Sequence, residues 1–321
     1  MTIHVTFRPD NQQPPVIQSP LPREATQITT PGTEQVGLGR VRKNNPSSIE
    51  KDKVAEILDE LDAFIGLVTV KRLIRELQAY VEIQKRRTRE KLIAEPLVLH
   101  MIFRGNPGTG KTTVARLVGR LLKEMGALQK GHVIESERAD LVGEYIGHTA
   151  QKTREQLKKA LGGVLFIDEA YSLARGGEKD FGKEAIDALV KAMEDNKDNL
   201  VLILAGYRHE MDWFLQSNPG LRSRFPIHID FPDYSIDELL AIGNSMLKSR
   251  QYELTSEGSE ALRIHLQSLL DTHPYAGNAR LVRNLVEKTV RKQAVRLFRK
   301  PNSSREELIQ ILPADITLED F

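Results

Sequence analysis

A glycine-rich turn, GNPGTGKT at residues 105–112, constrains the fold of this chain more than any other feature of the sequence. The apolar run LVLHMIF precedes the turn, and the amphipathic stretch TTVARLVGRLLKEM follows from its last threonine. In a G-x4-G-K-[ST] turn between a strand and a helix, backbone N–H groups surround phosphates, the lysine reaches the terminal phosphates and the next hydroxyl binds Mg²⁺. We therefore predict an ATP site in which Lys111 contacts phosphate and Thr112 binds Mg²⁺. Its residues are Gly105, Asn106, Pro107, Gly108, Thr109, Gly110, Lys111, Thr112 and Thr113.

A second motif, VLFIDE at residues 164–169, has the pattern of a buried strand that ends in two carboxylates. Such a strand places Asp168 at the carboxyl edge of a sheet, beside the phosphate loop, where it can hold Mg²⁺. Glu169 can then polarise the attacking water. Many strands end in acidic residues, so this motif alone does not indicate a catalytic site. It does so here because it follows a phosphate loop. The pair predicts hydrolysis of ATP rather than phosphoryl transfer to a small molecule.

Short apolar runs alternate with helical periods between residues 97 and 231. The runs LVLHMIF, HVI, VLFI, LVLILA and IHIDF predict five strands, and the helices between them favour a mostly parallel sheet covered on both faces. After Pro232 the sequence has helical stripes and a capping box from Ser235 to Glu238, but no convincing strand. We predict an α/β domain over residues 48–234 and a small all-α domain over residues 235–321.

Residues 1–47 are rich in Pro, Gln and Thr and have no sustained period, which predicts a disordered arm. The 321-residue chain has a net charge of +2 and no cysteine, so composition indicates no general attraction to nucleic acid and excludes thiolate metal sites. No apolar run approaches the ~18 residues that span a bilayer, and the first residues lack a signal-peptide pattern. We expect a soluble, cytoplasmic protein.

Three arginines are candidates for the phosphoryl chemistry. Arg222 and Arg224 lie in NPGLRSRF, just before the run IHIDF, and Arg280 lies in GNAR at the start of a predicted helix. A planar guanidinium stabilises a transferring phosphoryl group, and a neighbouring subunit often supplies it. From the residues alone, Arg222 and Arg224 could instead pair with surface carboxylates, and Arg280 could belong to the exposed face of a basic helix.

Aromatic residues and histidine have ordinary structural interpretations at this level. Tyr145, in the stretch GEYIGHTA, is interpreted as a partly buried core aromatic when only its neighbours are considered. His100, on a predicted strand, and Trp213, in EMDWFLQ, are both expected to pack in the core.

The order of these parts resembles the AAA+ ATPases: a helical lead-in with an Ile-Gly-Leu box, a phosphate loop, an Asp-Glu strand, an arginine pair and a helical lid with its own arginine. The stretches EYIGHTAQKTRE, LFIDEAYSLARGGEKDFGKEAIDALVK, LILAGY and NPGLRSRFPIHIDFPDYS resemble the CbbX/CfxQ branch, which holds red-type rubisco activases and stage V sporulation ATPases. The resemblance covers about residues 50 to 300 and excludes the arm. The stretches RGGEKDFG and ERADLVGEYIGHTAQKTRE favour the sporulation side of this branch.

This resemblance implies a P-loop NTPase fold, ATP hydrolysis and a ring of identical chains, in hexameric form. It implies that Arg224 is the arginine finger, with Arg222 as a neighbour that could share or replace this role. It also implies that Arg280 is a sensor that contacts the nucleotide from the lid, and that Ile65 and Gly66 border the adenine.

The resemblance further implies that Tyr145, Ile146 and Gly147 form a pore loop that grips a polypeptide, with residues 175–178 as a second pore loop. The sequence departs from many AAA+ proteins in one place. The strand after the Asp-Glu strand usually ends in Asn or Thr, which orients the attacking water, whereas here it ends LAGY at Tyr207. Either Tyr207 substitutes for this residue or the water is held in another way, so the polar sensor stays unassigned.

The leading functional hypothesis is an ATP-driven ring that remodels or threads a protein client, with a role in sporulation that rests on the resemblance. The alternatives are a chaperone like the red-type rubisco activases, a DNA-handling AAA+ ATPase and a nucleotide-dependent scaffold. The aromatic pore loop favours a protein client, and the intact Glu169 and Arg224 count against a scaffold. The basic stretch RLVRNLVEKTVRKQAVRLFRK alternates charge with core positions, so a solvated helix face explains it and no nucleic-acid partner is expected.

Overall fold

The computed structural model describes residues 46–93, 98–145, 147–176, 180–272, 277–300 and 302–316, with side chains from residue 52 onward. The predicted arm lies outside these residues except for its end, because the first helix, α1 (Pro46–Asp62), already begins at Pro46. None of the described helices combines the length and the apolar composition that crossing a membrane requires.

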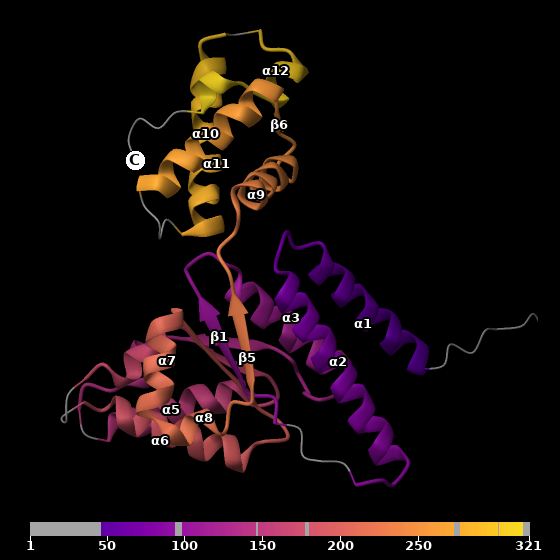
Figure 1. Ribbon diagram of the computed structural model, residues 1–321, viewed down its shortest axis with the longest axis vertical. Coiled ribbons are helices and arrows are strands. Elements are labelled where there is room, and N and C mark those ends of the chain that lie inside the picture. The colour runs from indigo at the N-terminus through magenta and orange to yellow at the C-terminus, as the bar shows by residue number, and fades with distance from the viewer. Residues whose placement is uncertain are drawn as a thin grey trace, which may run out of the picture. The chain divides into compact units, whose positions relative to one another are not determined.

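Five parallel strands form the central sheet, in the order β2-β3-β4-β1-β5, which confirms the predicted parallel sheet. Figure 1 shows two of them, β1 and the edge strand β5, side by side. Their bounds are β1 (Met101–Gly105), β2 (Val133–Ser136), β3 (Val164–Ile167), β4 (Val201–Gly206) and β5 (Ile227–Phe231). The register pairs the end of β1 with the ends of its two neighbours, Arg104 with Gly206 and Gly105 with Phe231. Ligands of open parallel sheets bind at this carboxyl edge, so the topology places a site beside Gly105.

Helices cover the sheet on both faces, as the crossover connections of parallel strands require. One face packs against α1, α2 (Val68–Arg89) and α3 (Lys111–Glu124). The other face packs against α4 (Arg138–Leu141), α5 (His148–Ala160), the 3₁₀ helix η1 (Ala170–Ala174), α6 (Gly182–Asp195), α7 (Arg208–Ser217) and α8 (Pro219–Arg222).

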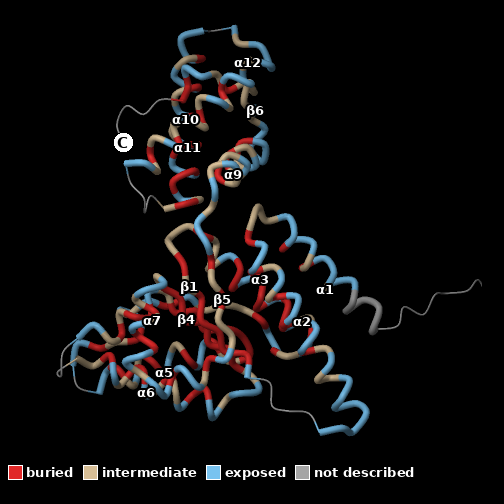
Figure 2. The backbone as a smooth tube through the Cα atoms, viewed as in Figure 1, coloured by how far each residue is buried: buried red, intermediate tan, exposed pale blue. Residues whose placement is uncertain are grey.

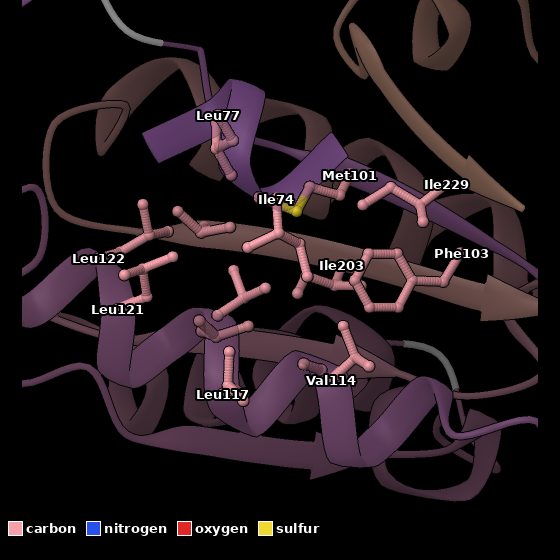
Figure 3. Packing of buried hydrophobic residues seen from close by; sticks show 14 of the residues in the cluster. Ile74, Leu77, Met101, Phe103, Val114, Leu117, Leu121, Leu122, Ile203 and Ile229 are labelled. Carbon is pink, nitrogen blue, oxygen red and sulfur yellow. The ribbon is translucent and has the colours of Figure 1, made fainter. Parts of the chain in front are cut away.

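Alternation along the strands explains how two cores form on one sheet. Met101 and Phe103 of β1 belong to the core under α2 and α3, whereas Ile102 between them belongs to the opposite core. Figure 3 shows the first of these cores, in which Ile74 of α2 and Leu117 of α3 pack against the strands. The inner strands β3 and β4 are buried at every residue, the edge strands β2 and β5 are only partly buried, and the helices expose their outer faces (Figure 2). Each such apolar side chain contributes about 1.5–3 kcal/mol of burial free energy.

The last part of the chain has its own core of leucine and isoleucine side chains. Its helices are α9 (Ile236–Lys248), α10 (Ser256–Thr272), α11 (Asn278–Phe298) and α12 (Arg305–Ile309), followed by the 3₁₀ helix η2 (Pro313–Asp315). The capping box at α9 is confirmed: Ser235 Oγ accepts from the Glu238 N–H, and the Glu238 carboxylate accepts from the Ser235 N–H at 2.8 Å. The expectation of an all-α domain needs a small correction, because β6 (Glu253–Leu254) and β7 (Gln310–Ile311) form a parallel pair. Strands this short carry no alternation that a sequence pattern can reveal.

Two single-residue expectations have opposite outcomes. His100 is buried, with 3% of its surface exposed, as predicted. Trp213 is 50% exposed, so its assignment to the core was wrong. Helix α7 buries Met211, Phe214 and Leu215, and a rotation of 100° per residue turns Trp213 away from that stripe.

The His100 ring should make the stability of the protein depend on pH. Its Nδ1 accepts the Leu202 N–H at 3.1 Å, and burial lowers the pKa of His100 from 6.5 to about 4. Between these values the folded ring stays neutral while the unfolded ring gains a proton, so stability is fully present above pH 6.5 and is lost as pH falls toward 4. We expect a loss of about 2 kcal/mol between pH 7.5 and pH 5, measured by urea unfolding.

A His100→Gln variant removes the titrating ring and should lose this part of the pH dependence, whereas His209→Gln, at an exposed position, should keep it. Equal pH profiles for the wild type and His100→Gln would show that the ring is not held neutral.

Candidate active site

The phosphate loop joins β1 to α3 and has a backbone that only glycine adopts easily. Gly108 has φ +74°, and Gly110, the residue before the helix, has φ +97°. A Cβ on Gly108 would lie 2.1 Å from the carbonyl oxygen of Gly277, so no side chain fits there. The first N–H groups of α3 have no partner within the helix and, with the helix dipole, favour an anion at this point.

The loop opens into a cavity of about 650 Å³, within the range of small-molecule sites. Most of the residues predicted for the nucleotide line this cavity: Gly105, Pro107, Gly108, Gly110, Lys111, Thr112, Thr113, Ile65, Asp168, Glu169 and Arg280. Three others do not. Gly66 lies between two lining residues. The side-chain amide of Asn106 donates to the Asp233 carboxylate. Thr109 is fully buried, and its hydroxyl donates to the Asn106 carbonyl at 2.8 Å. Asn106 and Thr109 therefore shape the loop.

The two carboxylates follow directly on the buried strand β3. The Asp168 N–H donates to the Ser136 carbonyl at 3.0 Å, and Asp168 Oδ1 accepts the Glu169 N–H at 3.0 Å. Glu169 has φ +47°, a left-handed conformation that is uncommon for a residue with a side chain. Strain of this kind is concentrated at functional sites, and it sets the direction in which the Glu169 carboxylate leaves the strand end.

Lys111 is the central cation of the cavity. Its Nζ donates to the carbonyl oxygens of Gly105 at 2.8 Å and Asn106 at 2.9 Å. Burial lowers the pKa of Lys111; the charge of Asp168 acts in the opposite direction, and that of Arg280 adds to the lowering. These charges are therefore close enough to act on the ammonium group, as expected where phosphates are bound between them.

The donor set fits Mg²⁺. The Thr112 hydroxyl and the Asp168 carboxylate line the same cavity and are oxygen ligands, which Mg²⁺ prefers. Within the described residues, no group of three or more His, Cys, Asp or Glu side chains forms a metal cage. Mg²⁺ typically takes one or two protein ligands and completes its shell with water and substrate phosphates.

Asn278 ties the lid to the phosphate loop, a role that sequence reasoning missed. Its Nδ2 donates to Asp233 Oδ1 at 2.8 Å and to the Pro107 carbonyl at 3.3 Å, and its Oδ1 accepts the Tyr234 N–H at 2.9 Å. The residue is 6% exposed and has φ +48°. This cluster fixes the start of α11 and hence the place of Arg280. Its only signal in the sequence was the GNAR turn.

The cavity has further walls that the motifs did not predict. Ile242 and Met246 of α9 line it, although their spacing only indicated a core stripe. Tyr207 also lines it, with its ring centroid 6.0 Å from that of Tyr171. The remaining unpredicted lining residues are Ala63, Phe64, Leu67, Arg116, Gly206, Tyr234, Ser245, Ala279 and Arg283.

Arg222 and Arg224 do not line this cavity. The Arg224 guanidinium forms an ion pair with Glu194 and donates from Nη1 to the Gly220 carbonyl at 2.7 Å. Arg222 is exposed, and it makes no ion pair with the described residues. A finger role for either arginine therefore requires the nucleotide of another chain.

The stretch around Tyr145 is an exposed loop. Tyr145 is 66% exposed, so the core position that its neighbours alone suggested is wrong, and the exposed loop position that the resemblance implies fits this exposure. Thr149 Oγ1 accepts the Gly143 N–H at 2.9 Å across the base of the loop. Gly147 has φ +84°, and a Cβ at this position would have nothing within 4 Å of it. Ile146, and residues 177–179 of the second loop, lie outside the described residues.

Two family models match the chain in succession. The model of the ATPase family associated with various cellular activities matches residues 101–233, and the AAA lid domain matches residues 235–321.

Several proteins of known name are similar over most of their length. Stage V sporulation protein K of Bacillus subtilis (strain 168) is 54% identical over 267 residues, which cover 83% of each chain. Protein CbbX of Cereibacter sphaeroides is 51% identical, over 76% of this chain and 79% of that protein. A chloroplastic ribulose bisphosphate carboxylase/oxygenase activase of Cyanidioschyzon merolae (strain NIES-3377 / 10D) is 46% identical, over 85% of this chain and 94% of that protein.

Among solved structures, the Thermotoga maritima RuvB Holliday junction branch migration motor has a TM-score of 0.53 at 23% sequence identity. It covers 80% of this chain and 69% of that chain. At this identity the likeness shows the fold alone.

Proposed function

Because the chain belongs to the ATPases associated with various cellular activities, in the branch of stage V sporulation protein K and CbbX, and is an ATP hydrolase, we propose that it couples hydrolysis to remodelling of a protein client. In this proposal the chains form a ring, hexameric as the resemblance implies, and a client polypeptide is pulled through its pore. The single observation that carries the client proposal is the exposed Tyr145 on a loop closed by Gly143 and Thr149.

The proposed chemistry assigns a role to each group around the cavity. The glycine turn and the first N–H groups of α3 hold the β- and γ-phosphates of ATP, and Lys111 neutralises their charge. Thr112 and Asp168 would hold Mg²⁺, which supplies charge neutralisation on the phosphates. Glu169, directed by its left-handed backbone, accepts a proton from the attacking water. Arg280 contacts the phosphates from the lid.

The position of Arg224 supports the proposed ring. An arginine finger must contact the transferring phosphoryl group, and neither Arg222 nor Arg224 reaches the cavity of its own chain. The proposal therefore places Arg224 at the nucleotide of a neighbouring chain, so that a complete active site exists only between two subunits. A head-to-tail contact of this kind closes into a ring when its rotation permits.

Tyr145→Ala tests the pore function. Truncation of an exposed side chain usually changes stability by no more than about 0.5 kcal/mol, so the melting temperature and basal ATPase should stay near those of the wild type. Stimulation of the ATPase by an unfolded polypeptide, for which casein serves as the probe, should be lost. His148→Ala, which removes the ring that lies 5.5 Å from the Tyr145 ring between centroids, is the matched comparison and should retain most of the stimulation.

Duplex DNA should stimulate neither variant nor the wild type. Stimulation by DNA rather than casein, or full casein stimulation in Tyr145→Ala, would count against a protein-threading function.

A second candidate function is remodelling of ribulose bisphosphate carboxylase/oxygenase. The 46% identity to a protein named as its activase favours this client class. Reactivation of inhibited red-type enzyme in the presence of ATP would identify it, and the absence of reactivation would leave the sporulation client as the proposal.

A further inference from the structure

We propose that Glu194 is a positioning residue for Arg224: it orients the guanidinium so that its terminal N–H groups face the nucleotide of the neighbouring chain. This inference rests on the proposed finger role of Arg224. Glu194 is far from the phosphate loop in the sequence, belongs to no motif and does not line the nucleotide cavity of its own chain.

The contacts of Arg224 leave its functional end available. Nε donates to Glu194 Oε1 at 3.1 Å, Nη2 donates to the same oxygen, and Nη1 donates to the Gly220 carbonyl at 2.7 Å. A guanidinium has five N–H groups, so three are used and one remains on each terminal nitrogen. Two N–H groups on neighbouring nitrogens are what a phosphate accepts in a bidentate contact.

Both side chains project from backbone whose neighbouring residues are buried in the core. Leu221 and Phe225, on either side of Arg224, are 2% and 1% exposed, and the Arg224 N–H donates to the Leu221 carbonyl at 3.0 Å. Met193, next to Glu194 on α6, is 3% exposed. A site supported by buried elements holds its geometry more closely than one supported by a free loop.

One buried ring links the two backbones. The His100 ring lies 5.8 Å from the Phe225 ring, between centroids, and the Met193 backbone lies near enough to the ring to act on its pKa, in the direction opposite to burial. Phe225 follows Arg224 and Met193 precedes Glu194, so the neighbours of both partners contact the same side chain. The distance between the two backbones is thereby set in the core, and the ion pair on the surface follows from it.

Exposure indicates that Glu194 orients Arg224 rather than withholding it. The Arg224 side chain is 34% exposed and the Glu194 side chain 59%. Ion pairs at such exposure are weak, because water competes for both charges. One carboxylate cannot compete with the several charges of a triphosphate, but it can fix one edge of the guanidinium before the phosphate arrives.

The test compares the steady-state ATPase rates of four variants: Glu194→Ala, Arg224→Ala, the double variant and Asp195→Ala. The protein concentration is high enough that the rate per chain no longer rises with it. Glu194→Ala should lower the turnover about five- to tenfold, because a misplaced catalytic group lowers the rate. The loss should stay moderate, because the Gly220 carbonyl still holds the Arg224 guanidinium. The KM for ATP should not change, since the nucleotide cavity of each chain is intact. Asp195, the adjacent exposed carboxylate without an ion pair among the described residues, should tolerate alanine.

The double variant decides whether the effect passes through Arg224. In the Arg224→Ala background, single-turnover rates should show no additional loss from Glu194→Ala, because nothing is left to orient. Glu194→Gln, which retains an acceptor oxygen at the same reach, should recover most of the rate.

Three results would overturn the inference while leaving the finger role intact: an unchanged rate in Glu194→Ala, a raised rate, or an equal loss with and without Arg224. A wild-type rate in Arg224→Ala would instead refute the finger role, and the inference with it. Thermal melts of each variant separate these outcomes from misfolding.

Discussion

Glu169→Gln should bind ATP as tightly as the wild type and hydrolyse it about a thousandfold more slowly. An amide cannot take the proton of the attacking water, and general-base catalysis contributes on the order of 10²- to 10⁴-fold. Lys111, Thr112 and Asp168 still line the cavity, so the contacts that hold Mg-ATP are unchanged. Binding is measured with a fluorescent ATP analogue and hydrolysis by phosphate release.

Two variants calibrate this result. Lys111→Ala should lose binding itself, since it removes the cation that neutralises the terminal phosphates. Glu155→Gln, an exposed position on α5 outside the cavity, should behave as the wild type. Wild-type turnover in Glu169→Gln would show that another group activates the water.

Arg224→Ala should lower turnover by about a thousandfold without weakening ATP binding to the same chain. Removal of an arginine finger costs on the order of 10³- to 10⁵-fold in rate, and Arg224 does not line the cavity of its own chain. The ATPase rate per wild-type chain should also rise with protein concentration, because the proposed active site forms only between chains. Arg222→Ala removes the same charge two residues away and decides which arginine carries the role.

Mixing two inactive variants should restore activity. A chain with Arg224→Ala retains an intact Glu169, and a chain with Glu169→Gln retains an intact finger, so about a quarter of the interfaces in a random mixture are complete. A rate that does not depend on concentration, from a protein that stays monomeric with ATP, would refute the ring.

Local sequence patterns were sufficient to locate the proposed phosphate loop. A strand, a glycine turn and the helix after it are contiguous, and their chemistry requires particular residues at fixed spacing, so the loop from Gly105 to Thr113 could be located by its spacing alone. The inner strands β3, β4 and β1 were equally readable, because burial on both faces forces continuous apolar runs, whereas the edge strands β2 and β5 are only partly buried and have weaker patterns. The helical stripes and the capping box at Ser235 follow from the same local physics.

Patterns were insufficient where a side chain could face either way. Trp213 and Tyr145 are both aromatic residues beside apolar neighbours, and both are exposed, at 50% and 66%. An aromatic residue on a helix is buried only if its face of the helix packs against the sheet. An aromatic residue in a loop is buried only if the loop packs against the rest of the domain. Neither condition is encoded in the nearest neighbours alone.

The sequence by itself determined the nucleotide chemistry and the order of strands and helices along the chain, because both depend on short, contiguous stretches. Only the tertiary structure decided which distant residues meet. Asn278 contacts Pro107 and Asp233, Ile242 lines the cavity, and Glu194 pairs with Arg224. These polar pairs and cavity walls depend on how the folded cores place one backbone against another, and no spacing in the sequence encodes that distance.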